Sequence, residues 1–210
     1  MNFNDFIKFI PKLSNLSLGG FDTQYKLAPK IRKPYTTNSL EKNNPNKAAV
    51  LSLFYPNEIG ETMFLLTLRA NYGGTHSSQI SFPGGKFNQT DVTLTNTALR
   101  ETFEEVGVQI SKDSVFKQMT NVYIPPSNFL VTPFLAYLTT KPIFKKNYEV
   151  ETLIEVSLAD FLKKSSLSST ILTTSYAKDI TVPCFKLNNY IVWGATAMML
   201  SEINELFEKI

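Results

Sequence analysis

The sequence predicts an α+β fold, an α/β/α sandwich in which a central mixed β-sheet is flanked by helices. Strand-like runs outnumber helical runs along the chain, and the helical runs lie between strands rather than in one block, which favours helices on both faces of a sheet. With 43% hydrophobic and 19% charged residues in 210, the chain can bury a substantial core and is not intrinsically disordered.

Composition excludes several classes of protein. The single cysteine, Cys184, rules out an intrachain disulfide and a Cys-rich zinc site, and the single histidine, His76, rules out a metal site built on two histidines. A net charge of +3 is too small to indicate a nucleic-acid partner. No apolar run reaches the roughly 18 residues of a membrane helix, so we expect no membrane partner.

Residues 1–45 are predicted to be an N-terminal extension, a short helix followed by a loop. Apolar residues recur at helical spacing from Phe3 to Leu13, and Pro11 is expected to kink or end this helix. The polar stretch to Asn46 is expected to be loosely structured. A helix that packs on the core is favoured over a targeting segment, because the first arginine is Arg32 and a mitochondrial presequence is Arg-rich.

The compartment stays open among cytoplasm, mitochondrion and peroxisome. There is no clear presequence, and the final residues Glu208-Lys209-Ile210 are not a peroxisomal tripeptide. Oligomeric state is not indicated either, although a homodimer is kept as an alternative.

Residues 46–210 are predicted to form the main domain. Buried strands are expected at 48–55 and 62–69, and further strands at 115–123, 129–138 and 152–156. A hairpin is expected from 180–187 and 190–193, turning at Asn188-Asn189. Helices are expected at 92–106, 158–164 and 195–207, the first ended by Gly107.

The helix at 92–106 carries an unusual cluster of acidic residues. At 100° per residue, Glu101, Glu104 and Glu105 share one face, and the opposite side is expected to supply a buried stripe of Leu99, Phe103 and Val106. Three carboxylates repel one another unless a cation lies among them, and carboxylate oxygens are the ligands that Mg²⁺ or Mn²⁺ prefers. The alternative is an ordinary solvated acidic face.

Pro83-Gly84-Gly85 lies just before this helix and alters the balance between the two readings. Adjacent glycines allow a close backbone approach of the kind that a phosphate-cradling loop requires, and Lys86 adds a cation. An ordinary turn explains the glycines alone. Together, a phosphate-sized loop and an acidic helix face indicate metal-assisted attack on a phosphate.

These residues resemble the signature of the Nudix hydrolases, G-x5-E-x7-R-E-U-x-E-E-x-G-U, in which U is aliphatic. The matching residues are Gly85, Arg100, Glu101, Glu104, Glu105, Gly107 and Val108. The first acidic position is Asp91 rather than Glu, eight residues rather than seven separate it from Arg100, and Thr102 fills an aliphatic position. The first two departures are similar to the variant in the coenzyme A branch of the family.

The resemblance to the coenzyme A diphosphatases extends over about residues 47–210. Upstream it includes 65–70, with Arg69, and 79–85; downstream it includes 126–133, 149–150, 156–158 and 193–197. His76 falls where many relatives have a histidine. Gly74 stands where a second arginine is expected and Ser78 where a glycine is expected, which puts substrate choice in doubt.

The resemblance implies a role for each matching residue. Glu101, Glu104 and Glu105 would be ligands of Mg²⁺ or Mn²⁺, with the Gly85 carbonyl as a further ligand. Arg100 would orient Glu101, or form only an ordinary pair with Glu104 one helical turn away. Glu105 or Glu104 would take the proton of the attacking water. The implied substrate-binding residues are Arg69, His76, Gly84, Gly85 and Lys86.

The implied reaction is hydrolysis of the pyrophosphate of coenzyme A or acyl-CoA, giving 3′,5′-ADP and 4′-phosphopantetheine or its acylated form. Two alternatives stay open. The substrate could be another nucleoside diphosphate derivative, such as ADP-ribose or NADH, or the chain could be a catalytically silent binding module. The complete acidic set argues against the silent module, because a pure binder has no need of clustered repulsion.

Overall fold

The computed structural model describes residues 1–70, 79–174 and 177–210. Its centre is a mixed sheet in the order β3-β2-β1-β7-β5, with β4 paired to β1, β6 to β7 and β8 to β2. β1 and β7 run parallel, and the other pairs are antiparallel. The strands are β1 (Asn46–Pro56), β2 (Thr62–Arg69), β3 (Ile80–Ser81), β4 (Gly84–Lys86), β5 (Val115–Gln118), β6 (Val122–Ile124), β7 (Phe129–Tyr137) and β8 (Val150–Ser157).

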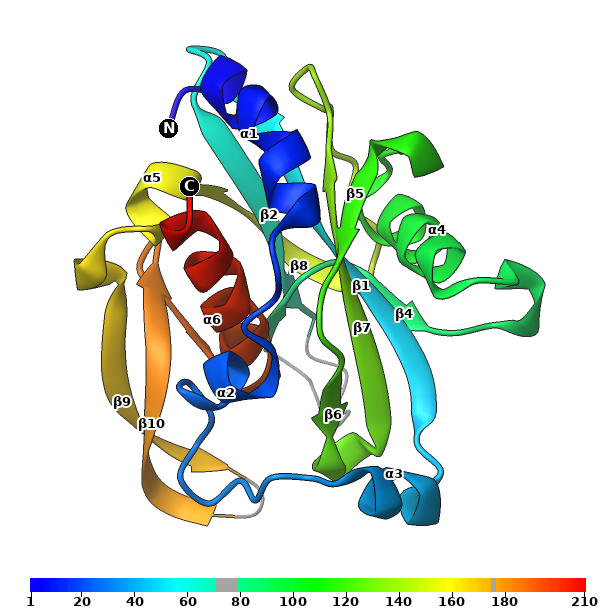
Figure 1. Cartoon of the computed structure of the whole chain (residues 1–210), viewed down its shortest axis with the longest axis vertical. Helices are drawn as coiled ribbons and strands as arrows, with labels where there is room; N and C mark the ends of the chain where they lie inside the picture. Colours follow the sequence, from blue (N-terminus) through cyan, green and yellow to red (C-terminus); the bar gives the residue numbers. More distant parts are fainter. Residues whose placement is uncertain (71–78, 175–176) are drawn as a thin grey trace.

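A second sheet of three antiparallel strands lies beside the first (Figure 1). It contains β9 (Leu167–Thr174), β10 (Ala177–Leu187) and β11 (Tyr190–Trp193). The predicted hairpin turn is confirmed, because Asn188 and Asn189 have φ of 48° and 66°, as a tight turn between twisted strands requires. β9 was not predicted, since its Ser- and Thr-rich sequence has no clear apolar alternation.

Helices cover both faces of the central sheet, as predicted (Figure 1). Alternate residues of β1 point to opposite faces. Leu51, Leu53 and Tyr55 belong to one apolar core together with Val106 of α4 (Leu94–Val106). Phe54 belongs to the other core, formed with α1 (Phe3–Asn15) and α6 (Gly194–Glu208). The α+β sandwich is therefore confirmed.

The N-terminal segment is more ordered than expected. α1 continues past Pro11 to Asn15, because its apolar stripe stays buried on both sides of the proline, at Phe6 and Leu13, while Pro11 itself is exposed. The stretch expected to be loose contains α2 (Gly20–Tyr25) and α3 (Thr37–Asn43). Side chains of α6 hold α2: Glu202 accepts a hydrogen bond from the backbone N–H of Gly20 at 2.8 Å.

Two other elements are shorter than predicted. The strand expected at 115–123 is two strands, β5 and β6, because between them Thr120 donates its N–H to the side chain of Glu202 at 3.1 Å. The helix expected at 158–164 is short, α5 (Leu158–Phe161), followed by a 3₁₀ turn at Lys164–Ser166.

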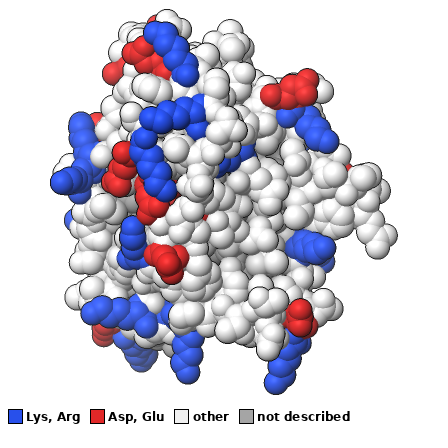
Figure 2. Space-filling model, viewed as in Figure 1, with Lys and Arg blue, Asp and Glu red and all other residues white. Residues whose placement is uncertain are grey.

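The charged surface is mixed. On the face shown in Figure 2, the described Lys and Arg side chains are interspersed with Asp and Glu rather than gathered into one basic stripe. Among the described helices, none combines the length and the apolar composition needed to cross a membrane.

Candidate active site

Helix α4 presents the acidic residues, and both of its ends are fixed. The hydroxyl of Thr93 caps the N-terminus by accepting the N–H of Asn96 at 3.2 Å. The predicted end at Gly107 is confirmed: its φ is +72°, its N–H donates to the carbonyl of Phe103 at 2.8 Å, and an added Cβ would lie 2.9 Å from Lys145 atoms.

The predicted buried stripe of α4 was partly wrong. Val106 is buried, but Phe103 is 53% exposed, and Leu99 is only partly buried. Thr102 points inward instead, and its hydroxyl donates to the carbonyl of Ala98 at 2.7 Å, so the buried polar group is satisfied. The inward face is therefore turned by about one residue, and this rotation also buries Glu105.

Asp91 anchors the arginine of the acidic helix. Its buried carboxylate accepts from Arg100 Nε at 2.7 Å and Nη2 at 3.0 Å, and also from the Asn88 N–H and the Thr97 hydroxyl, each at 2.9 Å. These donors, Arg100 first, hold the pKa of Asp91 below its ordinary value. We did not predict this role, although the motif comparison singled out the position.

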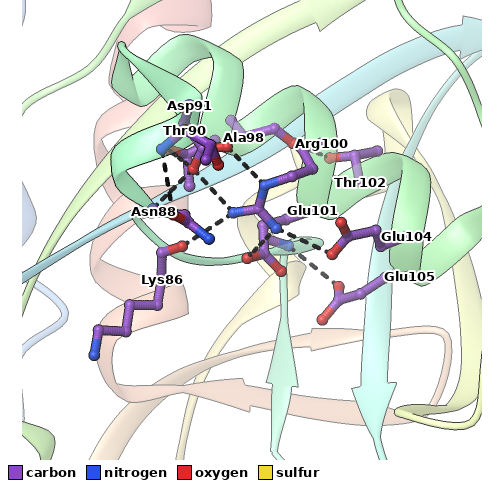
Figure 3. A network of polar contacts seen from close by, with 12 residues as sticks. Lys86, Asn88, Thr90, Asp91, Ala98, Arg100, Glu101, Thr102, Glu104 and Glu105 are labelled. Carbon is purple, nitrogen blue, oxygen red and sulfur yellow. Dashed lines mark hydrogen bonds and ion pairs between the residues drawn. The ribbon is translucent and has the colours of Figure 1, made fainter.

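Arg100 in turn holds two carboxylates of the helix (Figure 3). Its Nη1 lies 2.8 Å from Glu101 Oε1 and 3.0 Å from Glu104 Oε2, and its Nη2 donates to the carbonyl of Lys86 at 3.1 Å. The contacts on which both considered roles of Arg100 depend, one with Glu101 and one with Glu104, are therefore present together, and the orienting role stays a prediction.

The extra residue of the motif is absorbed just after Asp91. Residues 89–91 form a 3₁₀ turn, and Val92 follows with φ of +65°, a conformation that costs energy for a β-branched residue. This tight turn brings the short Asp91 side chain to Arg100. The departures in residue type and in spacing therefore act as one structural unit.

Gly85 packs directly against Glu101. A Cβ added at Gly85 would lie 2.4 Å from Glu101 Oε2, far inside van der Waals contact, so any larger residue would push the carboxylate out of this position. Burial raises the pKa of Glu101, while Arg100 opposes that effect. The absence of a side chain at Gly85 thus lets the Glu101 carboxylate lie directly against the backbone.

Glu105 lies deepest of the three. Its carboxylate accepts from Arg69 Nη1 at 3.1 Å and from the Gly84 N–H at 3.2 Å, and its side chain is only 3% exposed. Burial raises the pKa of Glu105 to about 7, and the Arg69 charge opposes that rise. A carboxyl group with a pKa close to neutrality can both accept and release a proton.

Glu149 is a site residue that sequence reasoning missed. It lies in the loop between β7 and β8, and its Oε2 is 3.5 Å from Arg69 Nη2. Its charge raises the pKa of both Glu101 and Glu105, so it lies within electrostatic reach of each. The resemblance to the coenzyme A diphosphatases included residues 149–150, but it gave Glu149 no role at the site.

The charges at the site are unbalanced in favour of a cation. Five carboxylates, those of Asp91, Glu101, Glu104, Glu105 and Glu149, face the two guanidinium groups of Arg69 and Arg100. This excess of negative charge, together with the packing of the Glu101 carboxylate against the Gly85 backbone, fits a divalent ion. In the described parts of the chain, however, no three acidic, His or Cys side chains already stand close enough together to coordinate a metal.

The residues predicted to contact substrate either bond to other groups, point away from the carboxylates or lie outside the described residues. Arg69 is engaged with Glu105 and Glu149, and the Gly84 N–H is engaged with Glu105. The Lys86 side chain extends away from the carboxylates (Figure 3). His76 lies outside the described residues, as do the departures at positions 74 and 78. The roles of these residues toward substrate stay predictions.

Comparison with known families agrees with the geometry. The family described as NUDIX domain matches residues 45–170. The chain belongs to this family. The predicted family is confirmed, and with it the predicted class of enzyme, a Nudix hydrolase. The predicted boundary between residues 1–45 and 46–210 stays a prediction.

Two curated relatives share about a third of their residues with this Nudix chain. Mitochondrial coenzyme A diphosphatase NUDT8 of Mus musculus is 33% identical over 144 residues, which are 67% of this chain and 68% of that protein. The Homo sapiens protein of the same name is 32% identical over 67% of this chain and 61% of its own length. The chain thus matches about two thirds of the length of these relatives.

Solved structures show the same fold. A MutT/nudix family protein from Enterococcus faecalis is 16% identical, with a TM-score of 0.56 over 99% of this chain and 75% of that one. The Nudix hydrolase RenU of M. Smegmatis is 18% identical, with a TM-score of 0.50 over 79% of this chain and 88% of that one. At these identities the likeness concerns the fold alone.

Proposed function

We propose that this chain hydrolyses the pyrophosphate bond of coenzyme A or acyl-CoA, using Mg²⁺ or Mn²⁺, and releases 3′,5′-ADP and 4′-phosphopantetheine or its acylated form. The observation that carries the proposal is the excess of carboxylates around Arg69 and Arg100 on the motif helix. The 33% identity to a protein named a coenzyme A diphosphatase supports this choice of substrate.

Glu101 and Glu104, with the carbonyl of Gly85, would hold the ion, and Glu149 is close enough to contribute. A bound divalent ion neutralises charge on the pyrophosphate oxygens and so lowers the barrier to attack on phosphorus. Oxygen ligands and spare negative charge are what such an ion requires.

Glu105 is the better placed of the two residues considered for the general base. Its pKa of about 7 suits proton acceptance near neutral pH, and its burial keeps it in one orientation. In the reaction a water oxygen bonds to one phosphorus, the bridging P–O bond breaks, and the water proton passes to the carboxylate. Glu104 is half-exposed and lacks this environment.

The direct test is hydrolysis of coenzyme A by the purified chain with Mg²⁺, with the fragments identified by mass. We expect 3′,5′-ADP and 4′-phosphopantetheine, and loss of turnover when a chelator removes the metal. Turnover that persists with chelator would contradict the role of the ion. Absence of turnover with either Mg²⁺ or Mn²⁺ would contradict the proposed activity.

Replacing Glu105 tests its role within the site. Glu105→Gln keeps the shape of the side chain but removes the base, and we expect kcat to fall by about 10²–10⁴-fold while the protein stays folded. Glu208→Gln, at an exposed position of α6, is the matched control and should leave activity unchanged. Unchanged turnover in Glu105→Gln would remove this residue from the mechanism and favour a different base.

A second candidate substrate is another nucleoside diphosphate derivative, such as ADP-ribose or NADH. Gly74 and Ser78 favour it, because they replace residues that the coenzyme A branch is expected to carry. A panel of these substrates, with products identified by mass, separates the two. Efficient cleavage of ADP-ribose or NADH without cleavage of coenzyme A would overturn our choice. Binding without any turnover would favour the silent module.

The proposal also includes a compartment, the mitochondrion. The word mitochondrial in the names of two relatives favours the mitochondrion over the cytoplasm and the peroxisome. Imaging of the full chain fused at its C-terminus to a fluorescent protein tests this, and a signal outside mitochondria would contradict it.

A further inference from the structure

Tyr148 is an exposed aromatic residue at the edge of the carboxylate site. Its side chain is 87% exposed, whereas every other tyrosine whose burial the structure describes is buried or half-buried. In the described parts of the chain its ring stacks on no other ring and its hydroxyl makes no hydrogen bond. Single exposed apolar groups are common, so exposure alone decides nothing. What distinguishes Tyr148 is its position in a loop segment that is anchored to the site.

The backbone on both sides of Tyr148 is tied to the site. The N–H of Asn147 donates to the carbonyl of Glu105 at 2.9 Å, and the carbonyl of Glu149 accepts the N–H of Ala70 at 2.8 Å. The N–H of Glu149 also donates to the Asn147 side chain at 2.9 Å. The chain therefore bridges from α4 to the end of β2, and Tyr148 stands at the middle of this bridge.

This anchoring has an energetic consequence. Ordering a loop on binding costs free energy, and a ring on a backbone that is already fixed avoids most of that cost. A tyrosine ring has few rotatable bonds and presents a flat face, which suits contact with a planar ligand. The structure thus fixes the backbone that carries this ring, one residue from Glu149 and close to the carboxylates that are proposed to bind the metal.

We propose that the ring of Tyr148 is the platform on which the base of the substrate's nucleotide half stacks. This inference rests on the proposed function, which supplies a substrate with a pyrophosphate next to a nucleoside. A nucleobase has a π-face that stacks on an aromatic side chain, whereas the pantetheine arm is a flexible chain without such a face. Tyr148 is thus assigned to substrate specificity and not to the chemical step.

The kinetic test compares Tyr148→Ala and Tyr148→Phe with wild type on coenzyme A. Losing one base stack should raise the KM of Tyr148→Ala about tenfold, with little change in kcat, while Tyr148→Phe keeps the ring and should keep most of the affinity. Ile143→Ala is the matched control, because Ile143 lies in the same loop and is 91% exposed. A KM for Tyr148→Ala within twofold of wild type would overturn the proposal.

A binding measurement separates this inference from the proposed activity. By calorimetry without turnover, Tyr148→Ala should weaken the binding of AMP about tenfold and leave that of 4′-phosphopantetheine unchanged. Equal weakening of both ligands, or of 4′-phosphopantetheine alone, would overturn the assignment to the base. If wild type binds AMP through Tyr148 but cleaves no coenzyme A, the proposed function fails and the base platform stands.

Discussion

Arg100 forms a bidentate ion pair with Asp91, in which Nε lies 2.7 Å from Oδ1 and Nη2 lies 3.0 Å from Oδ2. Two parallel bonds of this kind fix the plane of the guanidinium group as well as its position. The remaining nitrogen, Nη1, is thereby aimed at Glu101 and Glu104. Arg100 need not touch substrate, yet it sets the positions of Glu101 and Glu104, the two residues that would hold the metal.

Asp91→Asn tests this positioning role. The amide cannot accept both charge-assisted bonds, so we expect the free energy of unfolding to fall by about 2 kcal/mol. With Arg100 no longer fixed, Glu101 and Glu104 lose their orientation, and kcat/KM should fall by at least about tenfold. Urea unfolding and steady-state hydrolysis measure the two effects.

Asp113→Asn is the control for this change, because Asp113 lies at an exposed position outside the site. It should alter neither stability nor turnover. If Asp91→Asn is less stable but fully active, then Asp91 supports the fold and does not position the carboxylates.

Val92 offers a test of the extra residue in the motif. Its φ of +65° is strained for a β-branched residue, and its side chain is 79% exposed, so little packing is lost on truncation. Val92→Gly should therefore raise the free energy of unfolding by about 1 kcal/mol. Val92→Ala keeps a Cβ and should gain much less. Equal stability of all three proteins in urea would show that the turn stores no strain.

The sequence was sufficient for most of the fold because its periodicities reflect burial. β2 and the β10–β11 turn were predicted from apolar runs and turn residues, and the end of α4 from Gly107. α2 could not be predicted in this way. It depends on Glu202 of α6, whose hydrogen bond to Gly20 joins residues 182 positions apart, and no local pattern encodes such a contact.

The site shows the same division between local and long-range information. The motif indicated Glu101, Glu104 and Arg100, which are neighbours on one helix. Glu149 joins them only because its loop packs against α4, and the buried carboxylate of Glu105 is paired with Arg69 of β2. The inward position of Thr102 was missed because a threonine is read as polar unless its hydroxyl is known to bond to the helix itself.

Glu205 makes stability depend on pH. Hydrogen bonds from Thr23, Lys26 and Lys209, with Thr23 the largest contributor, lower the pKa of Glu205 from 4.5 to about 2. A carboxylate with a lowered pKa stabilises the fold above its unfolded pKa and loses that contribution as pH falls through the folded pKa. Glu205→Gln should therefore be less stable than wild type at pH 7, and the difference should shrink below about pH 4.5 and vanish near pH 2.

Urea unfolding of both proteins at pH 7, 4 and 3 measures this difference. Glu208→Gln is the control, because Glu208 is an exposed carboxylate on the same helix and bonds only to Asn204 among the described residues. It should differ little from wild type at pH 7. A gap between Glu205→Gln and wild type that is constant with pH would show that the charge of Glu205 contributes nothing.

Gly85→Ala tests whether the close packing of Glu101 against the Gly85 backbone matters for function. The new Cβ would lie 2.4 Å from Glu101 Oε2, and the flexible end of that side chain can swing away more easily than the backbone can move. We therefore expect a small loss of stability but a fall in kcat of about 10²-fold, since displacement of a positioned group by an ångström can cost that much. Steady-state hydrolysis, combined with thermal unfolding, separates the two effects.

Gly20→Ala is the comparison for this last change. A Cβ at Gly20 meets nothing within 4 Å, but the residue has φ of +65°, so alanine should cost stability without affecting the site. We thus expect opposite patterns for the two variants: Gly85→Ala loses activity with only a small loss of stability, whereas Gly20→Ala loses stability and keeps activity. If Gly85→Ala retains full turnover, the Glu101 carboxylate can work from a second position, and its packing against Gly85 is not what orients it.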